Sequence, residues 1–176
     1  MTPLDRRPFL ASLALALPAL ALPALALPAT ARAAAASPRE IVEAVYGKTD
    51  ANARWDQRLA QAMGRKQPFS KAFAAALRNA EAKGKKSGEP WLDFDPVSNS
   101  QDPSIHGLAV AVASEGKDTA CVRAEFHCAD ASNSPRAQVS YDFTRENGDW
   151  TLDDMRGLTM GKKGTGWSLR KLADAA

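Results

Sequence analysis

Apolar residues recur at helical spacing in the first part of the chain after residue 36. Ser37-Pro38-Arg39-Glu40 has the composition of a capping box: a hydroxyl at the cap, a proline at the first helical position and a glutamate three residues after the cap. The apolar face that follows consists of Ile41, Val42, Val45 and Tyr46. The pattern therefore predicts a short first helix that ends at Gly47.

Two further helical stretches are predicted before the apolar period changes from helical to strand spacing. The first lies across 51–63, where apolar residues recur at i, i+4 and i+8; these are Trp55, Leu59 and Met63. The second lies across 68–83, with an apolar side formed by Phe69, Phe73, Ala76, Leu77 and Ala80. Gly84-Lys85-Lys86-Ser87-Gly88 is expected to break this helix and to serve as a linker.

The apolar period then changes to two, which is typical of strands. The predicted strands are GLAVAVA (107–113), TACVRAEFHC (119–128), RAQVSYDFT (136–144) and WTLDDM (150–155). Asn147-Gly148 predicts a hairpin turn between the last two strands. Ser168 is expected to cap a short closing helix that carries Leu169 and Leu172.

Helices followed by antiparallel strands define an α+β fold. We expect the sheet to be curved, with the N-terminal helices packed on its concave side. Such an arrangement leaves a cone-shaped interior, a common place for a small-molecule pocket.

The first 33 residues have the organisation of a targeting segment. Arg6 and Arg7 form a charged n-region, residues 8–30 carry no charge, and Ala31-Arg32-Ala33 fits an A-x-A cleavage signal. The sequence ALALP occurs three times between Ala14 and Pro28, and a proline at every fifth residue disfavours a stable membrane helix.

We therefore interpret 1–33 as a cleaved signal peptide and 34–176 as a single α+β domain with no stable membrane span, located in the periplasm or secreted. Arg6-Arg7 followed by Phe9-Leu10 resembles a twin-arginine export signal, with the general secretory route as the alternative.

The charge balance gives no support for nucleic-acid binding. The whole chain has a net charge of +3, and removal of the first 33 residues leaves 20 basic and 19 acidic residues. A net charge of +1 on the remaining chain is that of an ordinary solvated surface. We expect no nucleic-acid partner.

The segment WLDFDPVSNSQDP (91–103) places carboxylates and amides beside aromatic residues. The set of interest is Trp91, Asp93, Asp95, Asn99 and Asp102. Carboxylate and amide oxygens are the ligands that Ca²⁺ prefers, but the spacing differs from a helix-loop-helix calcium loop and lacks its glycine and closing glutamate. Asp and Asn also bond nearby backbone N–H groups in turns. We favour a structural turn, with a ligand-facing cluster and a metal site as alternatives, and we assign no metal ligands.

Asp154 is a second candidate, because strand alternation puts it on the face of Trp150 and Leu152. A carboxylate in an apolar interior can serve as a general base, and Tyr141 would be the matching hydrogen-bond donor. The alternatives are that Asp154 bonds a helix end or an arginine, or that a bulge at Asp153-Asp154 turns it outward. We favour these structural alternatives, so Asp154 and Tyr141 are weak catalytic candidates.

The two cysteines, Cys121 and Cys128, are disulfide candidates because export normally favours pairing. Seven residues along a straight strand span about 23 Å, however, and a disulfide needs Cα atoms within about 7 Å. Either the strand ends or bulges before Cys128, or the two thiols do not pair with each other.

The order of these motifs resembles an exported bacterial domain-of-unknown-function family of the nuclear-transport-factor-two-like, or cystatin-like, fold. The residues that carry the resemblance are WLDFDPVSNSQD, YDFTRENGDWTLDDM and SLRKL, and it extends over about 41–172. The resemblance implies a cone-shaped, cystatin-like domain and implies no particular activity.

These observations predict a non-catalytic module of the periplasm or cell envelope with a ligand-binding or structural role. Its predicted pocket contains Tyr141, Trp150 and Asp154, with Trp91 and Asp95 near the rim. The alternatives are a cofactor-independent isomerase, dehydratase or hydrolase that uses a pocket carboxylate, and a protein-interaction or inhibitor module. A small molecule is the expected partner, no cofactor is expected, and a homodimer stays open.

Overall fold

A computed structural model describes residues 36–50, 52–101, 105–128, 136–159 and 166–176. All of them belong to one compact unit, Ala33–Ala176. The predicted signal peptide, 1–33, lies outside the described residues.

The first two helices are α1 (Pro38–Gly47) and α2 (Trp55–Ala62). The predicted capping box begins α1: the hydroxyl of Ser37 accepts a hydrogen bond from the Glu40 N–H at 3.3 Å, and the Glu40 carboxylate accepts one from the Ser37 N–H at 2.8 Å. These two bonds satisfy backbone donors that the first helical turn leaves free.

The third helix, α3 (Lys71–Ser87), is longer at its C-terminal end than the sequence predicts. The hydroxyl of Ser70 caps it by accepting a hydrogen bond from the Phe73 N–H at 3.1 Å. The prediction of a linker over 84–88 is wrong, because Gly84 lies inside the helix and Gly88 ends it in a left-handed conformation. The backbone of Glu89 and Trp91 packs closely against Gly84.

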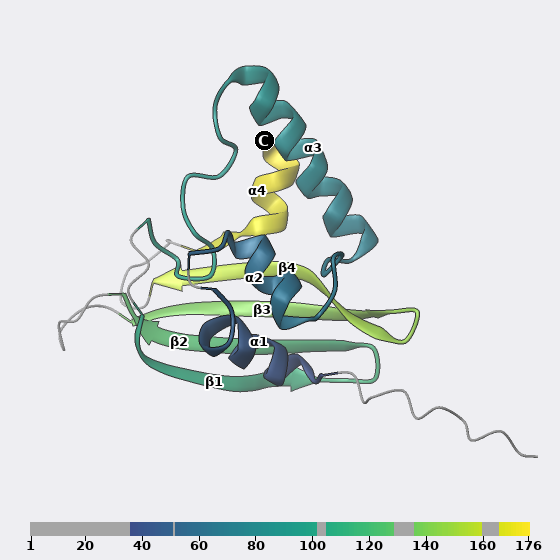
Figure 1. Ribbon diagram of the computed structural model, residues 1–176, viewed down its shortest axis with the longest axis vertical. Coiled ribbons are helices and arrows are strands. Elements are labelled where there is room, and N and C mark those ends of the chain that lie inside the picture. Colours follow the sequence, from purple (N-terminus) through teal and green to yellow (C-terminus); the bar gives the residue numbers. More distant parts are fainter. Residues whose placement is uncertain (1–35, 51, 102–104, 129–135, 160–165) are drawn as a thin grey trace, which may run out of the picture. The chain divides into compact units, whose positions relative to one another are not determined.

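The sheet is an antiparallel meander with the order β1-β2-β3-β4-β5 (Figure 1). Its strands are β1 (His106–Glu115), β2 (Thr119–His127), β3 (Arg136–Glu146), β4 (Asp149–Thr159) and β5 (Trp167–Ser168). The chain ends in α4 (Leu169–Ala175), whose Ser168 cap accepts a hydrogen bond from the Lys171 N–H at 3.2 Å. The prediction of an α+β fold with an antiparallel sheet and a short C-terminal helix is confirmed.

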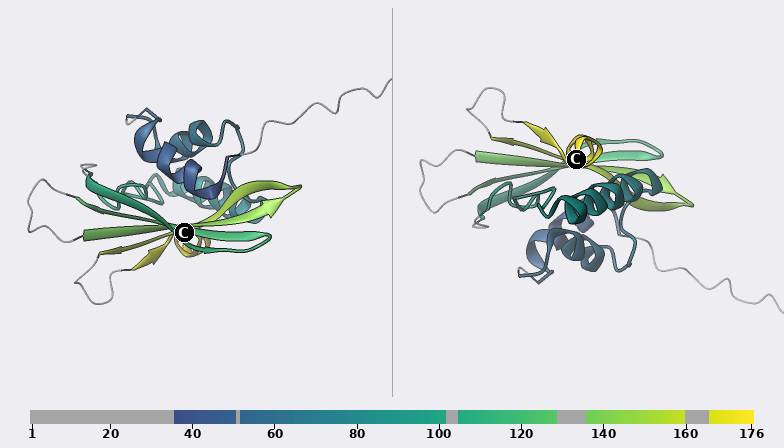
Figure 2. Two further views of the ribbon diagram at one scale, coloured as in Figure 1. Left: turned by 90° about the horizontal axis from the view of Figure 1, so that it is seen from below. Right: turned by 90° about the horizontal axis from the view of Figure 1, so that it is seen from above.

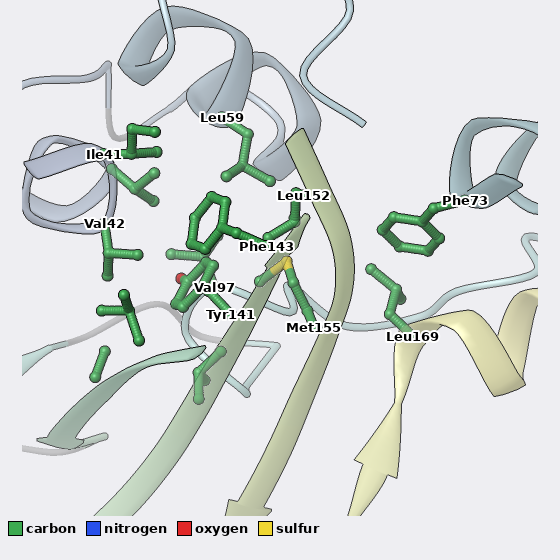
Figure 3. Close-up of a cluster of buried hydrophobic side chains, with 14 of the residues drawn as sticks. Ile41, Val42, Leu59, Phe73, Val97, Tyr141, Phe143, Leu152, Met155 and Leu169 are labelled. Carbon is green, nitrogen blue, oxygen red and sulfur yellow. The ribbon is translucent and has the colours of Figure 1, made fainter. Parts of the chain in front are cut away.

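Helices α1 and α2 lie over one face of the sheet, and α1 contacts β1 and β2 (Figure 2). Helices α3 and α4 pack side by side next to β4. Figure 3 shows Tyr141 and Phe143 from β3 and Leu152 and Met155 from β4 among the side chains of the helices. All four are at most 2% exposed. The helix-facing side of β3 and β4 is therefore filled by packed side chains.

Candidate functional site

Strand alternation alone predicts that Asp154 shares the face of Leu152. In the structure it does not. Cα pairing joins Phe143 to Leu152 but Asp142 to Asp154, so Asp153 is an extra residue in β4. A bulge of this kind reverses which side chains face the core beyond it. Met155 takes the inward position, and Asp154 faces outward.

The carboxylate of Asp154 bonds the start of α4. It accepts hydrogen bonds from the Ser168 hydroxyl at 2.7 Å and from the Arg170 N–H at 2.9 Å. Both structural alternatives, the bulge and the helix end, are thus observed together. The carboxylate is placed as a helix-stabilising group rather than as a base in an apolar pocket.

Tyr141 lies in the core and bonds a second tyrosine. Its hydroxyl donates to the hydroxyl of Tyr46 at 2.9 Å, and Tyr46 donates to the carbonyl of Val97 at 2.9 Å. Burial raises the pKa of Tyr141 and of Tyr46 above the usual value of 10.0. This chain of hydroxyls ties α1 and β3 to the loop that contains Val97.

Trp150, the third residue of the predicted pocket, is 5% exposed. The guanidinium of Arg145 lies 4.0 Å from the centre of its ring, and Arg65 donates a hydrogen bond to its carbonyl at 3.0 Å. These contacts hold Trp150 at the start of β4, where its side chain packs with the core.

Asp95 organises the acidic loop in two ways. One carboxylate oxygen accepts a hydrogen bond from the Val97 N–H at 2.9 Å, and the backbone of Asp95 pairs with Ser100. The other oxygen lies 3.4 Å from the guanidinium of Arg58, whose side chain is 7% exposed. Asp95 therefore shapes the loop and neutralises a buried arginine, as the structural-turn interpretation predicts.

The other polar residues of the loop point in different directions. Asp93 is exposed, and its carbonyl accepts a hydrogen bond from Gln101 at 3.2 Å. Asn99 has a left-handed backbone (φ 54°), and its side-chain oxygen accepts a hydrogen bond from the Trp167 indole at 2.5 Å. Asp102 lies outside the described residues. Ligand binding by these residues stays a prediction.

Within the described parts of the chain, no three His, Cys, Asp or Glu side chains are grouped so that they could hold a metal ion. Because Asp102 is outside those parts, the calcium alternative for the complete loop remains untested.

The two cysteines are free in the structure and have different surroundings. Strand β2 ends at His127, one residue before Cys128, and it pairs with β3 in unbroken register from Thr119 to His127, so no bulge within the strand shortens the distance between the two cysteines. Cys121 lies beside Arg156, while the thiol of Cys128 contacts the carbonyl of Ser98 at 3.6 Å. Burial raises the pKa of both thiols, which disfavours the reactive thiolate.

A cavity that the sequence did not reveal lies along the C-terminal part of α3, and we call it the Trp groove. Its volume is about 470 Å³. Its lining includes Trp55, Trp91, Phe94, Arg54, Glu81, Lys85 and Glu89. A volume of this size falls in the range that proteins use for small ligands.

Gly84 positions one wall of the Trp groove. A Cβ atom at this residue would lie 2.8 Å from the carbonyl oxygen of Glu89 and 3.3 Å from the backbone nitrogen of Trp91. Only a residue without a side chain allows the segment to approach the helix so closely. A glycine inside an Ala/Lys-rich helix, followed by Glu89-Pro90-Trp91, is the sequence signal that could have indicated this contact.

Trp55 links the lining of the Trp groove to the protein core. Its ring lies 5.6 Å from that of Phe69, and Phe69 lies 5.4 Å from Phe73. A second cavity, of about 230 Å³, shares Trp55, Glu81 and Trp91 with the Trp groove. Trp55 is thus supported by packed aromatic rings.

Charges of both signs surround the aromatic walls. The guanidinium of Arg54 lies 3.2 Å from Asp56 and 3.3 Å from Glu81. The charge of Asp56 raises the pKa of Arg54, so its guanidinium stays cationic. Lys85 and Glu89 add one further charge of each sign. The Trp groove therefore offers flat apolar surfaces with nearby hydrogen-bonding groups.

Of the predicted ligand-binding residues, Trp91 lines the Trp groove. Tyr141 and Trp150 lie in the core, and Asp154 lies at the start of α4. In the described structure, Trp91 therefore lies at a cavity, while Tyr141 and Trp150 lie in the packed core. Trp55 and Gly84, which sequence reasoning assigned to a core stripe and a linker, are the site residues that it missed.

Comparisons of the chain with protein-family models, with curated proteins and with solved structures gave no match. In the described part of the chain, none of the helices combines the length and the apolar character needed to span a membrane.

Proposed function

We propose that this protein is a non-catalytic module that binds a small organic molecule in the Trp groove, outside the cytoplasm. The observation that carries the proposal is the cavity of about 470 Å³ whose lining includes Trp55 and Trp91. Pockets for small molecules combine a mainly apolar lining with a few polar groups that orient the ligand. The Trp groove has both features.

The lining suggests the chemistry of the ligand. Indole rings offer flat faces on which a planar apolar part of a ligand can stack. Such faces also attract a cationic group, whether it belongs to the ligand or to the protein. Lys85 at the groove can pair with an anionic substituent, and Glu81 or Glu89 can accept hydrogen bonds. The proposed ligand is a flat or ring-containing molecule with an anionic or hydrogen-bonding end.

The cavity is supported by a preformed wall. Gly84 allows the backbone of 89–91 to pack against α3, and the row Trp55–Phe69–Phe73 holds the Trp55 ring in place. A preformed site needs little ordering when a ligand binds, which favours affinity.

The enzyme alternative has less support. It requires a carboxylate with a raised pKa beside a tyrosine, whereas Asp154 accepts two hydrogen bonds at the start of α4 and Tyr141 donates to Tyr46. Tyr141 is fully buried, and Asp154 is not among the residues that line the Trp groove. The proposal therefore concerns binding.

The proposal also includes export of the protein and a cone-shaped, cystatin-like fold. The organisation of 1–33 supports export to the periplasm or beyond, and the motif order supports a cone-shaped, cystatin-like domain. Mass measurement of the exported protein tests the first of these: cleavage after Ala33 gives a chain that begins at Ala34.

The binding proposal is tested with 1-anilinonaphthalene-8-sulfonate, a flat aromatic anion whose emission increases in apolar sites. We expect saturable binding of one probe per folded chain, and a roughly tenfold loss of affinity in Trp91→Ala. Leu172→Ala, which shortens an exposed apolar side chain on α4, is the matched control and should bind as the unaltered protein does.

Native mass spectrometry of gently purified protein adds an independent readout. A bound mass that is lost on denaturation and absent from Trp91→Ala would identify the natural ligand. Equal probe affinity in Trp91→Ala and the unaltered chain, with both folded, would contradict the Trp groove as the binding site.

A further inference from the structure

The edge strand β1 is the most exposed apolar element of the described chain. Nine of its ten residues are exposed, and 107–113 reads GLAVAVA without a charged residue. The order of the sheet places β1 at its end, with β2 on one side. Among the described residues, no strand pairs with the other side. An edge of this kind can pair with a further strand, and proteins usually protect such edges with charges.

We propose that β1 pairs antiparallel with β1 of a second copy of this chain, around a two-fold axis at Val110. This would join two five-stranded sheets into one continuous sheet. The proposal goes beyond ligand binding and does not depend on the Trp groove.

The exposed apolar residues of β1 are self-complementary in this register. Val110 pairs with Ala124, and Val112 pairs with Val122, so both lie on the helix-facing side of the sheet. Leu108 shares that side by alternation, because the register shift between His106 and Ala109 falls at Gly107, which has a left-handed backbone (φ 62°). Leu108 is 40% exposed and Val112 is 42% exposed despite the neighbouring α1. A two-fold axis at Val110 places Leu108 of each copy opposite Val112 of the other.

The opposite face of the proposed interface is complementary in charge. Ala109 pairs with Glu125, and Ala111 pairs with Arg123, on the neighbouring strand β2. In the proposed register, Ala109 of one copy faces Ala111 of the other. Glu125 and the Arg123 of the second copy then lie at the two ends of one row, with two alanines between them.

This row favours a second copy over an unrelated strand. Its two charged Cα atoms are three strand spacings, about 14 Å, apart, and the alanines leave room for both long side chains to extend toward each other. The two-fold axis generates the same row twice. Arg136 also lies 3.7 Å from Glu125, so the glutamate would sit between two cations.

Bulges limit the pairing to a short stretch. Register shifts lie between His106 and Ala109 and between Val112 and Ser114. Bulges bend a strand and restrict open-ended edge pairing. They leave the region around Val110 regular, which fits a closed dimer better than a growing fibre.

The oligomeric state of the full chain is the first test, measured by sedimentation equilibrium across a wide concentration range. We expect a reversible dimer. A monomer at every concentration would overturn the proposal. So would a protein that stays monomeric and binds only a separately added peptide at the β1 edge.

A cysteine scan tests the register. Residues directly opposite in an antiparallel pair have Cα atoms about 4.5 or 5.5 Å apart, within the range of a disulfide. Val110→Cys should therefore cross-link two copies under mild oxidation. In Val112→Cys, the two introduced thiols are separated by four residues along the strands, roughly 13 Å, and should not cross-link. Peptide mapping separates these bonds from any through Cys121 or Cys128. A cross-link at 112 but not at 110 would overturn the register.

A charge swap separates specific pairing from a general loss of apolar surface. In Leu108→Lys/Val112→Lys, like charges face each other twice in the dimer; in Leu108→Lys/Val112→Glu, opposite charges do. The first variant should dimerise roughly tenfold more weakly than the second. Leu172→Lys changes an exposed leucine on α4 and should dimerise as the unaltered chain does. Equal dimer affinity in the two double variants, both folded by circular dichroism, would overturn the proposal.

Discussion

Arg58 and Asp95 form an ion pair beneath the acidic loop, with 3.4 Å between guanidinium nitrogen and carboxylate oxygen. The same guanidinium donates a hydrogen bond to the carbonyl of Val45 at 3.1 Å. The Nε atom of Arg58 is buried and has no hydrogen-bond partner among the described residues. A single arginine of α2 thus connects α1 with the loop, and its charge depends on Asp95 for compensation.

Removal of Asp95 should therefore be strongly destabilising. Asp95→Ala leaves a buried cation without its counter-charge, and we expect the free energy of unfolding to fall by about 3 kcal/mol or more. Urea unfolding followed by tryptophan fluorescence measures this loss. Asp93→Ala, two residues away on an exposed side chain, is the matched control and should change stability by less than about 0.5 kcal/mol. Similar losses in the two variants would show that the ion pair has no special importance.

The two buried tyrosines predict a loss of stability at alkaline pH. Burial raises the pKa of Tyr46 and Tyr141 above 10.0, so the folded protein keeps these protons while the unfolded chain loses them. The folded state then binds more protons, and stability falls as the pH rises above 10.0. The slope should reach about 1.4 kcal/mol per pH unit for each tyrosine.

These are the chain's only two tyrosines, so tyrosinate absorbance reports on them directly. It should increase only when the protein unfolds. Tyr46→Phe/Tyr141→Phe is the control, and its unfolding free energy should depend less on pH above 10.0. Tyrosinate formation in the folded protein near pH 10.0 would contradict the buried hydroxyl chain.

Gly84→Ala should disturb the Trp groove although alanine is the better helix former. Its Cβ would lie 2.8 Å from the Glu89 carbonyl oxygen, so the backbone that leads to Trp91 must move. We expect lower stability and weaker probe binding. Gly47→Ala is the control, because its Cβ would meet no atom within 4 Å. That change should be neutral or stabilising by up to about 1 kcal/mol. If both variants behaved alike, close packing at Gly84 would be excluded as a determinant of the groove.

Asp154→Ala distinguishes the helix-capping role from a catalytic one. Loss of the hydrogen bonds to Ser168 and Arg170 should cost about 1–2 kcal/mol of stability and leave probe binding in the Trp groove unchanged. Asp174→Ala, an exposed change on the same helix, should have little effect on unfolding. A large change in ligand affinity without a change in stability would instead favour a site at Asp154.

Local patterns predicted the element types well. The capping box at Ser37, the helix cap at Ser168 and the turn at Asn147-Gly148 all act over a few residues, and the structure contains a helix start or a turn at each. The boundaries were less accurate. Gly84 was expected to end a helix, because the low helix propensity of glycine can be read from the sequence. Its tertiary contact with Glu89 cannot.

The candidate site was predicted only in part. Trp91 was expected near the rim of a pocket and does line a cavity, but its counterpart Trp55 comes from a helix 36 residues earlier. Alternation placed Asp154 on the face of Leu152, with a helix-end contact or a bulge at Asp153-Asp154 as the favoured alternatives. In the structure, one extra residue at Asp153 reverses the direction of Asp154. The sequence could name this bulge as an alternative but could not select it, because the register depends on pairing with β3.

The sequence by itself determined the helices, the four long strands, the order of these elements along the chain and the α+β class, because periodicity and capping depend on neighbours within a few positions. The tertiary structure decided the pairing of Arg58 with Asp95, the face of Asp154 and the walls of the Trp groove. Each of these depends on burial and contact between segments far apart in the chain. Their free energies arise only when those segments pack together.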